Sequence, residues 1–422
     1  MAGLCQVIAI IVGSIAISSA YEVNYNRYEV LRVTPKDTEE VNFLQYLRSK
    51  YGNELDFWVA PRSPGLPVDI MVPPGRHMEI QRQLRLRRFD FVTMIPDVQM
   101  LIDEEVKSKV NAEAGSNLNY TLYNDYDTIQ AWIDKIVSDY PHIASKEVLG
   151  KSHEGRDIHT LKLGKAGENK PIIFYNGGTH AREWIGPATV IYMAKLMTER
   201  YGKFDEITGL LNKIDWYITP VLNADGYIYS FTKDRNWRKT RSPNANSTCV
   251  RTDPNRNWDI HWDEVGASSD PCNDSYAGSK AFSEPEIKAI SDKLTSLKDR
   301  VKVYIDFHSY SQLWMTPYGW TPDLPPDYSD LKKLGEEAVK ALKAVNGTEY
   351  MVGSISNIIY PASGSSADWT YGVAKIKYSY GVELRDTGEY GFLLPSIYIE
   401  PSGLETFNAM KVLGHHILKK YT

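Results

Sequence analysis

The sequence predicts a mixed α/β domain, with a mainly parallel central sheet flanked by helices, preceded by a small α+β open sandwich. The chain has 422 residues, which is too long for one ordinary core. Residues 21–96 hold two successive strand–helix–strand patterns. From about residue 120, short apolar runs alternate with amphipathic stretches of helical period. We therefore divide the chain into 1–20, 21–96, 97–111 and 112–422.

The first 20 residues are typical of a secretory signal peptide. The apolar run from Leu4 to Ile17 suits the core of such a peptide and is too short for a comfortable membrane span. Small residues at Ser18 and Ala20 offer a cleavage site before Tyr21. We expect a secreted, extracellular protein, with a buried N-terminal helix as the alternative.

Residues 21–96 predict a small antiparallel sheet backed by two helices. The expected elements are strand 28–33, helix 39–50, strand 55–59, strand 68–72, a helix ending at Arg88 and strand 89–95.

Residues 97–111 are expected to connect the two units. The sequence becomes polar after Asp97, which predicts a helix that frays into an exposed linker open to proteases. Lys107 and Lys109 are the obvious points at which a trypsin-like protease would cut. An ordinary interdomain linker has the same composition, so composition alone does not establish a cleavage site.

Residues 112–422 predict the larger domain, with buried strands that alternate with helices. The expected elements are strand 171–178, helix 187–201, strand 214–222, helix 284–298, strand 301–308, helix 328–345, strand 376–384 and helix 404–420.

Charge and cysteine usage narrow the class of protein. The net charge of −5 gives no reason to expect nucleic acid or a membrane as a partner, and we expect a monomer. Cys5 lies in the expected signal peptide, which leaves Cys249 and Cys272 as an even pair. In an oxidising compartment they would form a disulfide worth about 3 kcal/mol; two buried free thiols are the alternative. Glycosylation triplets begin at Asn119, Asn246, Asn273 and Asn346.

A candidate metal site follows the predicted strand 171–178. His180 and Glu183 lie three residues apart, so one helical turn would place them on one face, just beyond the carboxyl end of a strand. His308 ends another apolar strand and is the best third ligand, which leaves a fourth position for water. Each residue alone is weak evidence, because surface polar residues explain most His-x-x-Glu pairs.

Three further segments place charge in unusual settings. Residues 235–241 and 253–258 set arginines beside tryptophans, and arginine suits the planar recognition of carboxylates. Glu383 lies inside an apolar strand, where a carboxylate is rare unless it is paired or catalytic. Surface ion pairs would explain any one arginine but not the whole set.

These segments together resemble the pancreatic-type zinc metallocarboxypeptidases of the A/B group. The chain carries that family's motifs in the family's order: His-Ala-Arg-Glu-Trp at 180–184, Asn-Trp-Arg-Lys-Thr-Arg at 236–241, Asn-Arg-Asn-Trp at 255–258, Phe-His-Ser-Tyr-Ser-Gln at 307–312 and Glu-Leu-Arg-Asp-Thr-Gly at 383–388. The resemblance extends from about residue 25 to the end of the chain. It implies an enzyme that removes single C-terminal residues, made as an inactive zymogen in which residues 21–96 are the activation domain.

The resemblance implies a role for each site residue. One Zn²⁺ per chain would be bound by His180, Glu183 and His308, and Asp253 would orient His180. Glu383 would be the general base, and Arg238 would stabilise the oxyanion. The residues implied to hold the terminal carboxylate are Asn255, Arg256 and Tyr360, with Arg182 in the neighbouring subsite.

The preferred side chain depends on the residue before Asp368 and Trp369. In the family an acid there selects lysine or arginine, whereas this chain has Ala367. Ile355 and Met315 would add apolar wall, and Gly381 would leave room. We therefore expect the A-type preference for apolar or aromatic residues, and Asp368 matches the family's structural acid.

Three alternatives remain distinguishable by sequence. A non-catalytic relative would lack Glu383 or Arg238, and an enzyme specific for basic residues would carry an acid at position 367. A serine hydrolase would need a Gly-x-Ser-x-Gly segment, which the chain lacks. We expect a role in digestion in a gut lumen. The expected partners are peptide C-termini, an activating trypsin-like protease and proteinaceous carboxypeptidase inhibitors.

Overall fold

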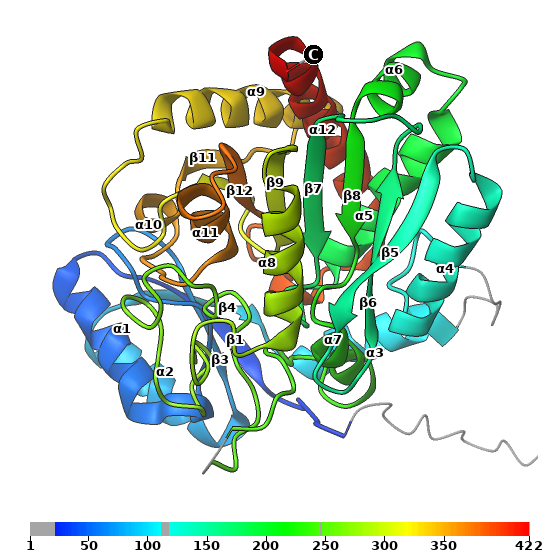
Figure 1. Cartoon of the computed structure of the whole chain (residues 1–422). Coiled ribbons are helices and arrows are strands. Elements are labelled where there is room, and N and C mark those ends of the chain that lie inside the picture. The colour runs from blue at the N-terminus through cyan, green and yellow to red at the C-terminus, as the bar shows by residue number, and fades with distance from the viewer. Residues whose placement is uncertain (1–21, 111–117, 245–246, 422) are drawn as a thin grey trace, which may run out of the picture.

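The computed structural model describes residues 22–110, 118–244 and 247–421. The expected signal peptide and the triplet residue Asn246 lie outside this part of the chain. Figure 1 shows a small blue unit against one end of a larger body in which helices cover both faces of a central sheet.

The small unit has the predicted architecture of four antiparallel strands in the order β2-β3-β1-β4, with two helices on the sheet. Its elements are β1 Glu29–Thr34, α1 Thr38–Tyr51, β2 Asp56–Val59, β3 Val68–Val72, α2 His77–Leu86 and β4 Asp90–Ile95. The Asp37 side chain begins α1 by accepting the backbone N–H of Glu40. Leu31, Leu44, Ile70 and Leu84 belong to a hydrophobic core of the unit's own.

The large sheet has eight strands in the order β11-β10-β12-β9-β7-β8-β6-β5. The strands are β5 Ala144–Lys151, β6 Asp157–Leu163, β7 Ile172–Gly177, β8 Asp215–Thr219, β9 Val301–His308, β10 Leu313–Thr316, β11 Met351–Ser354 and β12 Tyr378–Glu383. The central neighbours β12, β9, β7 and β8 run parallel, whereas β10/β12, β8/β6 and β6/β5 are antiparallel. The prediction of a mixed, mainly parallel sheet is confirmed.

The helices of the large domain flank this sheet, with α8 in front and α5 and α12 behind in Figure 1. They are α4 Tyr126–Asp139, α5 Ile185–Arg200, α6 Asp205–Lys213, α7 Ala224–Thr232, α8 Pro285–Leu297, α9 Tyr328–Asn346, α10 Ile355–Ile358, α11 Ser366–Gly372 and α12 Ile399–Tyr421. Helix α5 is buried on nearly every side because both the sheet and α12 pack against it.

The connecting segment begins with the predicted helix, and residues 111–117, where the exposed linker is expected, lie outside the described residues. Helix α3, Val98–Val110, continues through both candidate cleavage lysines, and Lys107 is exposed on it. Val98 and Ile102 are buried in the main hydrophobic core, which explains why the helix does not fray within the described residues. A cut after Lys107 or Lys109 stays a prediction, and a protease would have to unwind the end of α3 first.

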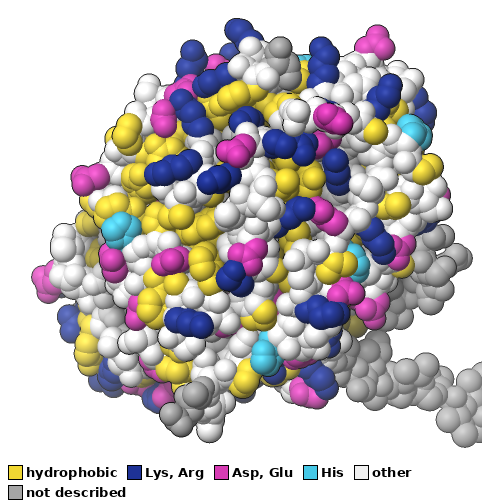
Figure 2. Space-filling model, viewed as in Figure 1, with side chains coloured by type: hydrophobic (Ala, Val, Ile, Leu, Met, Phe, Trp, Pro, Cys, Tyr) yellow, Lys and Arg dark blue, Asp and Glu magenta, His cyan; other side chains and the backbone are white. Residues whose placement is uncertain are grey.

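Two other features bear on the predicted class. Cys249 and Cys272 form a disulfide, as predicted, with the sulfurs 2.00 Å apart. Within the described ranges, the helices include none with the length and apolar character that a membrane crossing requires. Figure 2 shows basic and acidic side chains intermixed on this face, so the small net charge is not divided into large patches of one sign there.

Candidate zinc centre and active site

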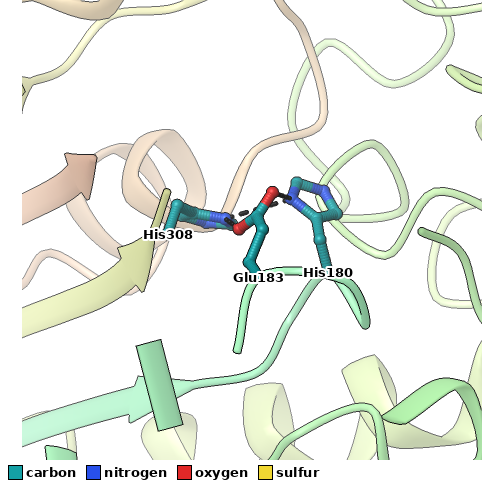
Figure 3. Close-up of side chains that lie close together, drawn as sticks. All are labelled: His180, Glu183 and His308. Atoms are coloured by element: carbon teal, nitrogen blue, oxygen red, sulfur yellow. Dashed lines mark hydrogen bonds and ion pairs between the residues drawn. The ribbon is translucent and has the colours of Figure 1, made fainter. Parts of the chain in front are cut away.

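Three buried side chains converge where β7 and β9 end. His180 and Glu183 come from the segment after β7, and His308 is the last residue of β9 (Figure 3). One ligand atom from each lies within 4.8 Å of the others. Nδ1 of His180 is 2.8 Å from Oε1 of Glu183, and Nδ1 of His308 is 3.1 Å from Oε2. The three predicted zinc ligands therefore lie close enough together to bind one metal ion.

The local backbone differs from the predicted helical turn. His180 and Glu183 lie in a tight turn before α5, in which the N–H of Glu183 donates to the His180 carbonyl at 3.3 Å. The glycine at 177 makes this turn possible, because a Cβ there would lie 2.9 Å from the backbone of Gly186. The end of β7 and the turn after it therefore lie close against the start of α5.

The donor set fits zinc. Two imidazole nitrogens and one carboxylate match the protein ligands of catalytic zinc sites, which keep a further position for water. The Nδ1 atoms of His180 and His308 lie 3.1 Å apart, so both nitrogens can bind the same metal ion once neither carries a proton. The site is therefore complete for one zinc ion per chain.

Asp253 lies behind His180, as predicted. Its Oδ1 is 3.0 Å from Nε2 of that histidine, and its Oδ2 accepts from the Arg238 guanidinium at 2.8 Å. Burial alone would raise the pKa of Asp253, but Arg238, His180 and Arg256 hold it well below the usual range. A permanently charged Asp253 fixes both the histidine and the arginine.

Glu383 ends β12 directly opposite His308 in the strand register. Burial raises the pKa of the Glu383 carboxyl to about 8, while the charge of His308 opposes the shift. Its Oε2 is buried and accepts no hydrogen bond from any residue in the described part of the chain. A carboxylate with an open acceptor beside the ligand set can exchange a proton with a nearby water.

Three of the predicted substrate-binding residues, Arg182, Arg256 and Tyr360, line a cavity of about 260 Å³. Arg238 and residues of the small domain, such as Trp58, line the same cavity. The Arg256 guanidinium lies 5.6 Å from the centre of the Tyr360 ring and donates to backbone carbonyls. Asn255 is placed by its Oδ1, which accepts the N–H of Ser366 at 2.9 Å.

An apolar cluster, against which Tyr360 packs, contains three of the residues predicted to form the side-chain pocket. Met315, Ile355 and Ala367 belong to it, together with Leu313 and Ile359. A Cβ at position 381 would touch the Met315 methyl at 3.6 Å, so the glycine there keeps space open.

The carboxylate of Asp368, next to Ala367, accepts hydrogen bonds from the backbone. Both of its oxygens accept the N–H of Gly319, at 3.0 and 2.9 Å, and one also accepts from Trp320. Burial raises the pKa of Asp368 to about 7.

The small domain covers this site with residues that sequence reasoning missed. Asp56 of β2 places Oδ2 2.7 Å from the Arg182 guanidinium, and the Asn236 amide donates to the same oxygen. The Trp58 ring packs 5.1 Å from that of Phe392. Asp56 and Trp58 lie on one face of a strand, but the sequence around them does not indicate that they contact Arg182 and Phe392.

Helix α3 adds a third contact. Glu105 accepts from the guanidinium of buried Arg235 at 2.7 and 3.2 Å, and Arg235 also donates to the Phe392 carbonyl. Two neighbouring ion pairs, Asp56–Arg182 and Glu105–Arg235, therefore anchor β2 and α3 to the catalytic domain.

Comparisons with known proteins agree with this geometry. The family model described as zinc carboxypeptidase matches residues 129–409, and that described as carboxypeptidase activation peptide matches residues 31–105. Carboxypeptidase B of Astacus astacus is 51% identical over 72% of this chain and 100% of its own. Carboxypeptidase A2 of Rattus norvegicus is 42% identical over 92% of this chain and 93% of its own.

Solved structures are similar as well. The crystal structure of thrombin activatable fibrinolysis inhibitor has a TM-score of 0.86, at 35% identity, over 94% of this chain and 100% of its own. The bovine protein, solved in complex with tick carboxypeptidase inhibitor, has a TM-score of 0.67 at 40% identity, over 71% of this chain and 99% of its own.

The chain belongs to the zinc carboxypeptidase family. Since an activation peptide precedes the catalytic domain, it is a procarboxypeptidase of the pancreatic type.

Proposed function

We propose that this zinc metallocarboxypeptidase zymogen is secreted, is activated by a trypsin-like protease, and then releases single apolar or aromatic residues from peptide C-termini. The zinc ion, when bound, is a Lewis acid that lowers the pKa of its water to about 7. Glu383 takes the proton of the attacking water and passes it to the leaving amine. In support, Glu383 is opposite the ligand His308 in the strand register, and its Oε2 has no hydrogen-bond partner among the described residues. Arg238, held by Asp253, donates to the developing oxyanion.

Arginines and polar side chains define the exopeptidase specificity. Arg256, Asn255 and Tyr360 hold the terminal carboxylate in the cavity they line or adjoin. A bidentate guanidinium–carboxylate pair favours chains that end at this point. Chains that continue would leave the buried arginine unpaired, at a cost of a few kcal/mol.

The A-type preference rests on one observation: Ala367 lies in an apolar cluster with Met315 and Ile355. A basic side chain in this pocket would need a carboxylate partner. The nearby acid Asp368 already accepts backbone N–H groups on both oxygens. Phe, Tyr, Leu and Trp side chains therefore fit this pocket better than Arg or Lys.

A preference for basic residues is the second candidate. The observation in its favour is the identity of 51% to the Astacus astacus carboxypeptidase B. The experiment compares kcat/KM for blocked dipeptides ending in Phe and in Arg on the trypsin-activated enzyme. We expect Phe to be preferred; a preference for Arg would replace the A-type proposal with the B-type one and leave the rest of the mechanism in place.

The activation domain blocks the site by occupying the substrate's contacts. Asp56 supplies a carboxylate to Arg182, the residue proposed for the neighbouring substrate subsite. Trp58 fills apolar surface at Phe392. Removal of residues up to the end of α3 would free both contacts, in line with cleavage after Lys109 or Lys107.

The proposal of secretion rests on the N-terminal sequence and on the disulfide Cys249–Cys272, which is typical of proteins in oxidising compartments. Protein inhibitors are further proposed partners, since the similar bovine protein binds a tick carboxypeptidase inhibitor.

A further inference from the structure

A carboxylate that the sequence pattern did not single out lies directly behind His308. Asp306 precedes this histidine by two residues on β9, so the two side chains share a face of the strand. Asp306 is fully buried, and its Oδ2 lies 3.0 Å from Nε2 of His308. Ser366 donates to the same oxygen at 2.8 Å.

The other oxygen of Asp306 is also occupied. Its Oδ1 accepts from Asn176 Nδ2 and from Thr179 Oγ1, each at 2.7 Å. Asn176 is opposite Asp306 in the register of β7 and β9, and Ser366 is the first residue of α11. Donors from β7, from the segment directly after it and from α11 therefore fix the orientation of this carboxylate, and it presents one remaining acceptor position to the histidine.

The proton on His308 decides whether the residue can bind a metal. Nδ1 faces the other two ligands, so it must be free of a proton, and the proton must be on Nε2. The second neighbour of Nε2 is Asn255 Nδ2 at 3.3 Å. The Asn255 oxygen already accepts from Ser366, so this amide presents a donor and favours an unprotonated Nε2. Asp306 supplies the opposing acceptor.

We propose that Asp306 is a positioning residue for zinc binding. It accepts a hydrogen bond from the Nε2–H of His308, which keeps the proton on Nε2 and leaves Nδ1 free to bind the metal. Asp306 does for His308 what Asp253 does for His180, so both histidines have a carboxylate behind them. This inference rests on the proposed ligand role of His308.

Asp306 could instead be a pocket acid that selects basic side chains. Gly381 is opposite it in the register of β12 and β9, and Ala367 follows its partner Ser366. Against this role, Asp306 has no exposed surface and both oxygens are already hydrogen-bonded. The test therefore includes substrate preference as an outcome.

The test uses Asp306→Asn in the full-length zymogen. The substitution keeps the shape and the oxygen that accepts from Asn176 and Thr179, but it turns an amide N–H toward Nε2. The matched control is Ser366→Ala, which removes a different hydrogen bond to the same oxygen and leaves the histidine contact. Zinc affinity is measured by competition with a chromophoric chelator. We expect Asp306→Asn to bind zinc about 10- to 100-fold more weakly, with little change in Ser366→Ala.

Several results would overturn the proposal. One is an unchanged zinc affinity in Asp306→Asn, and another is an equal loss in Ser366→Ala, which would indicate a structural role. An unchanged affinity with a shifted ratio of Arg to Phe hydrolysis would assign Asp306 to the pocket. If the wild-type protein bound no zinc, the proposed metal site itself would be wrong. The number of zinc ions bound per wild-type chain distinguishes this outcome from the others.

A measurement without any variant covers the case in which Asp306→Asn does not fold. In zinc-loaded wild-type protein, the Nε2 proton of His308 should give a slowly exchanging, downfield imidazole resonance, because a buried carboxylate accepts it. A rapidly exchanging proton at this nitrogen would contradict the proposal.

Discussion

Asp56→Ala should make the uncleaved zymogen partly active. The Asp56–Arg182 pair is 2.7 Å long, and its side chains are only 15% and 3% exposed. Loss of the carboxylate leaves a buried guanidinium without its charged partner, and breaking a buried pair in this way costs about 3–5 kcal/mol. Docking of the activation domain would weaken by roughly a hundredfold or more. Trp58 and the Glu105–Arg235 pair remain, so the domain should open more often without dissociating.

The assay is hydrolysis of a short blocked dipeptide by intact zymogen, with chain integrity checked after the reaction. The matched control is Asp90→Asn, because the Lys36–Asp90 pair is 53% and 74% exposed and such pairs contribute little. After trypsin, both variants should match the wild type, since the changed residues lie in the released part. If the intact Asp56→Ala zymogen were as inactive as the wild-type zymogen, the Asp56–Arg182 pair would not be what keeps the activation domain docked over the site.

Three further predictions follow from the site and the core. Glu383→Gln should lower kcat by about 10²- to 10⁴-fold, as expected for loss of a general base, while bound zinc stays at one per chain. Ala367→Asp should place a carboxylate in the apolar cluster and shift the ratio of Arg to Phe kcat/KM upward by roughly tenfold or more. Burial raises the pKa of Glu286 to about 8, so the folded protein binds this proton more tightly than the unfolded chain does. The stability of the wild type therefore falls as the pH rises from 4.5, the ordinary pKa of a glutamate, through 8. Glu286→Gln should therefore melt higher than the wild type at pH 8.5 and alike at pH 4.5 in thermal unfolding; an equal difference at both pH values would contradict the assignment.

Sequence reasoning recovered the elements whose apolar pattern is continuous. Strands such as β7 and β9 are buried along nearly their whole length, so their runs of apolar residues are unmistakable. The prediction missed β5, in which half of the residues are exposed, and its neighbour β6. It also missed β10 and β11, which have four residues each and are too short to show a period. Tertiary pairing, which no local pattern records, stabilises these strands.

The site residues that could be predicted are those that lie within the sequence motifs. His180, Glu183 and His308 converge as expected, although through a tight turn where a helical one was predicted. Asp56 and Asp306 were missed for a different reason. Each acts on a partner that the sequence does not reveal: Arg182 is 126 residues from Asp56, and the partners of Asp306 include Asn176, 130 residues away.

The most direct test of the central claim is release of C-terminal Phe by the purified zymogen before and after limited trypsin, with and without a zinc chelator. We predict little release before cleavage, rapid release after it, abolition by the chelator and recovery when one equivalent of zinc is restored. Unchanged activity in the chelated, demonstrably zinc-free enzyme, or no activity in cleaved protein that holds one zinc ion, would contradict the account.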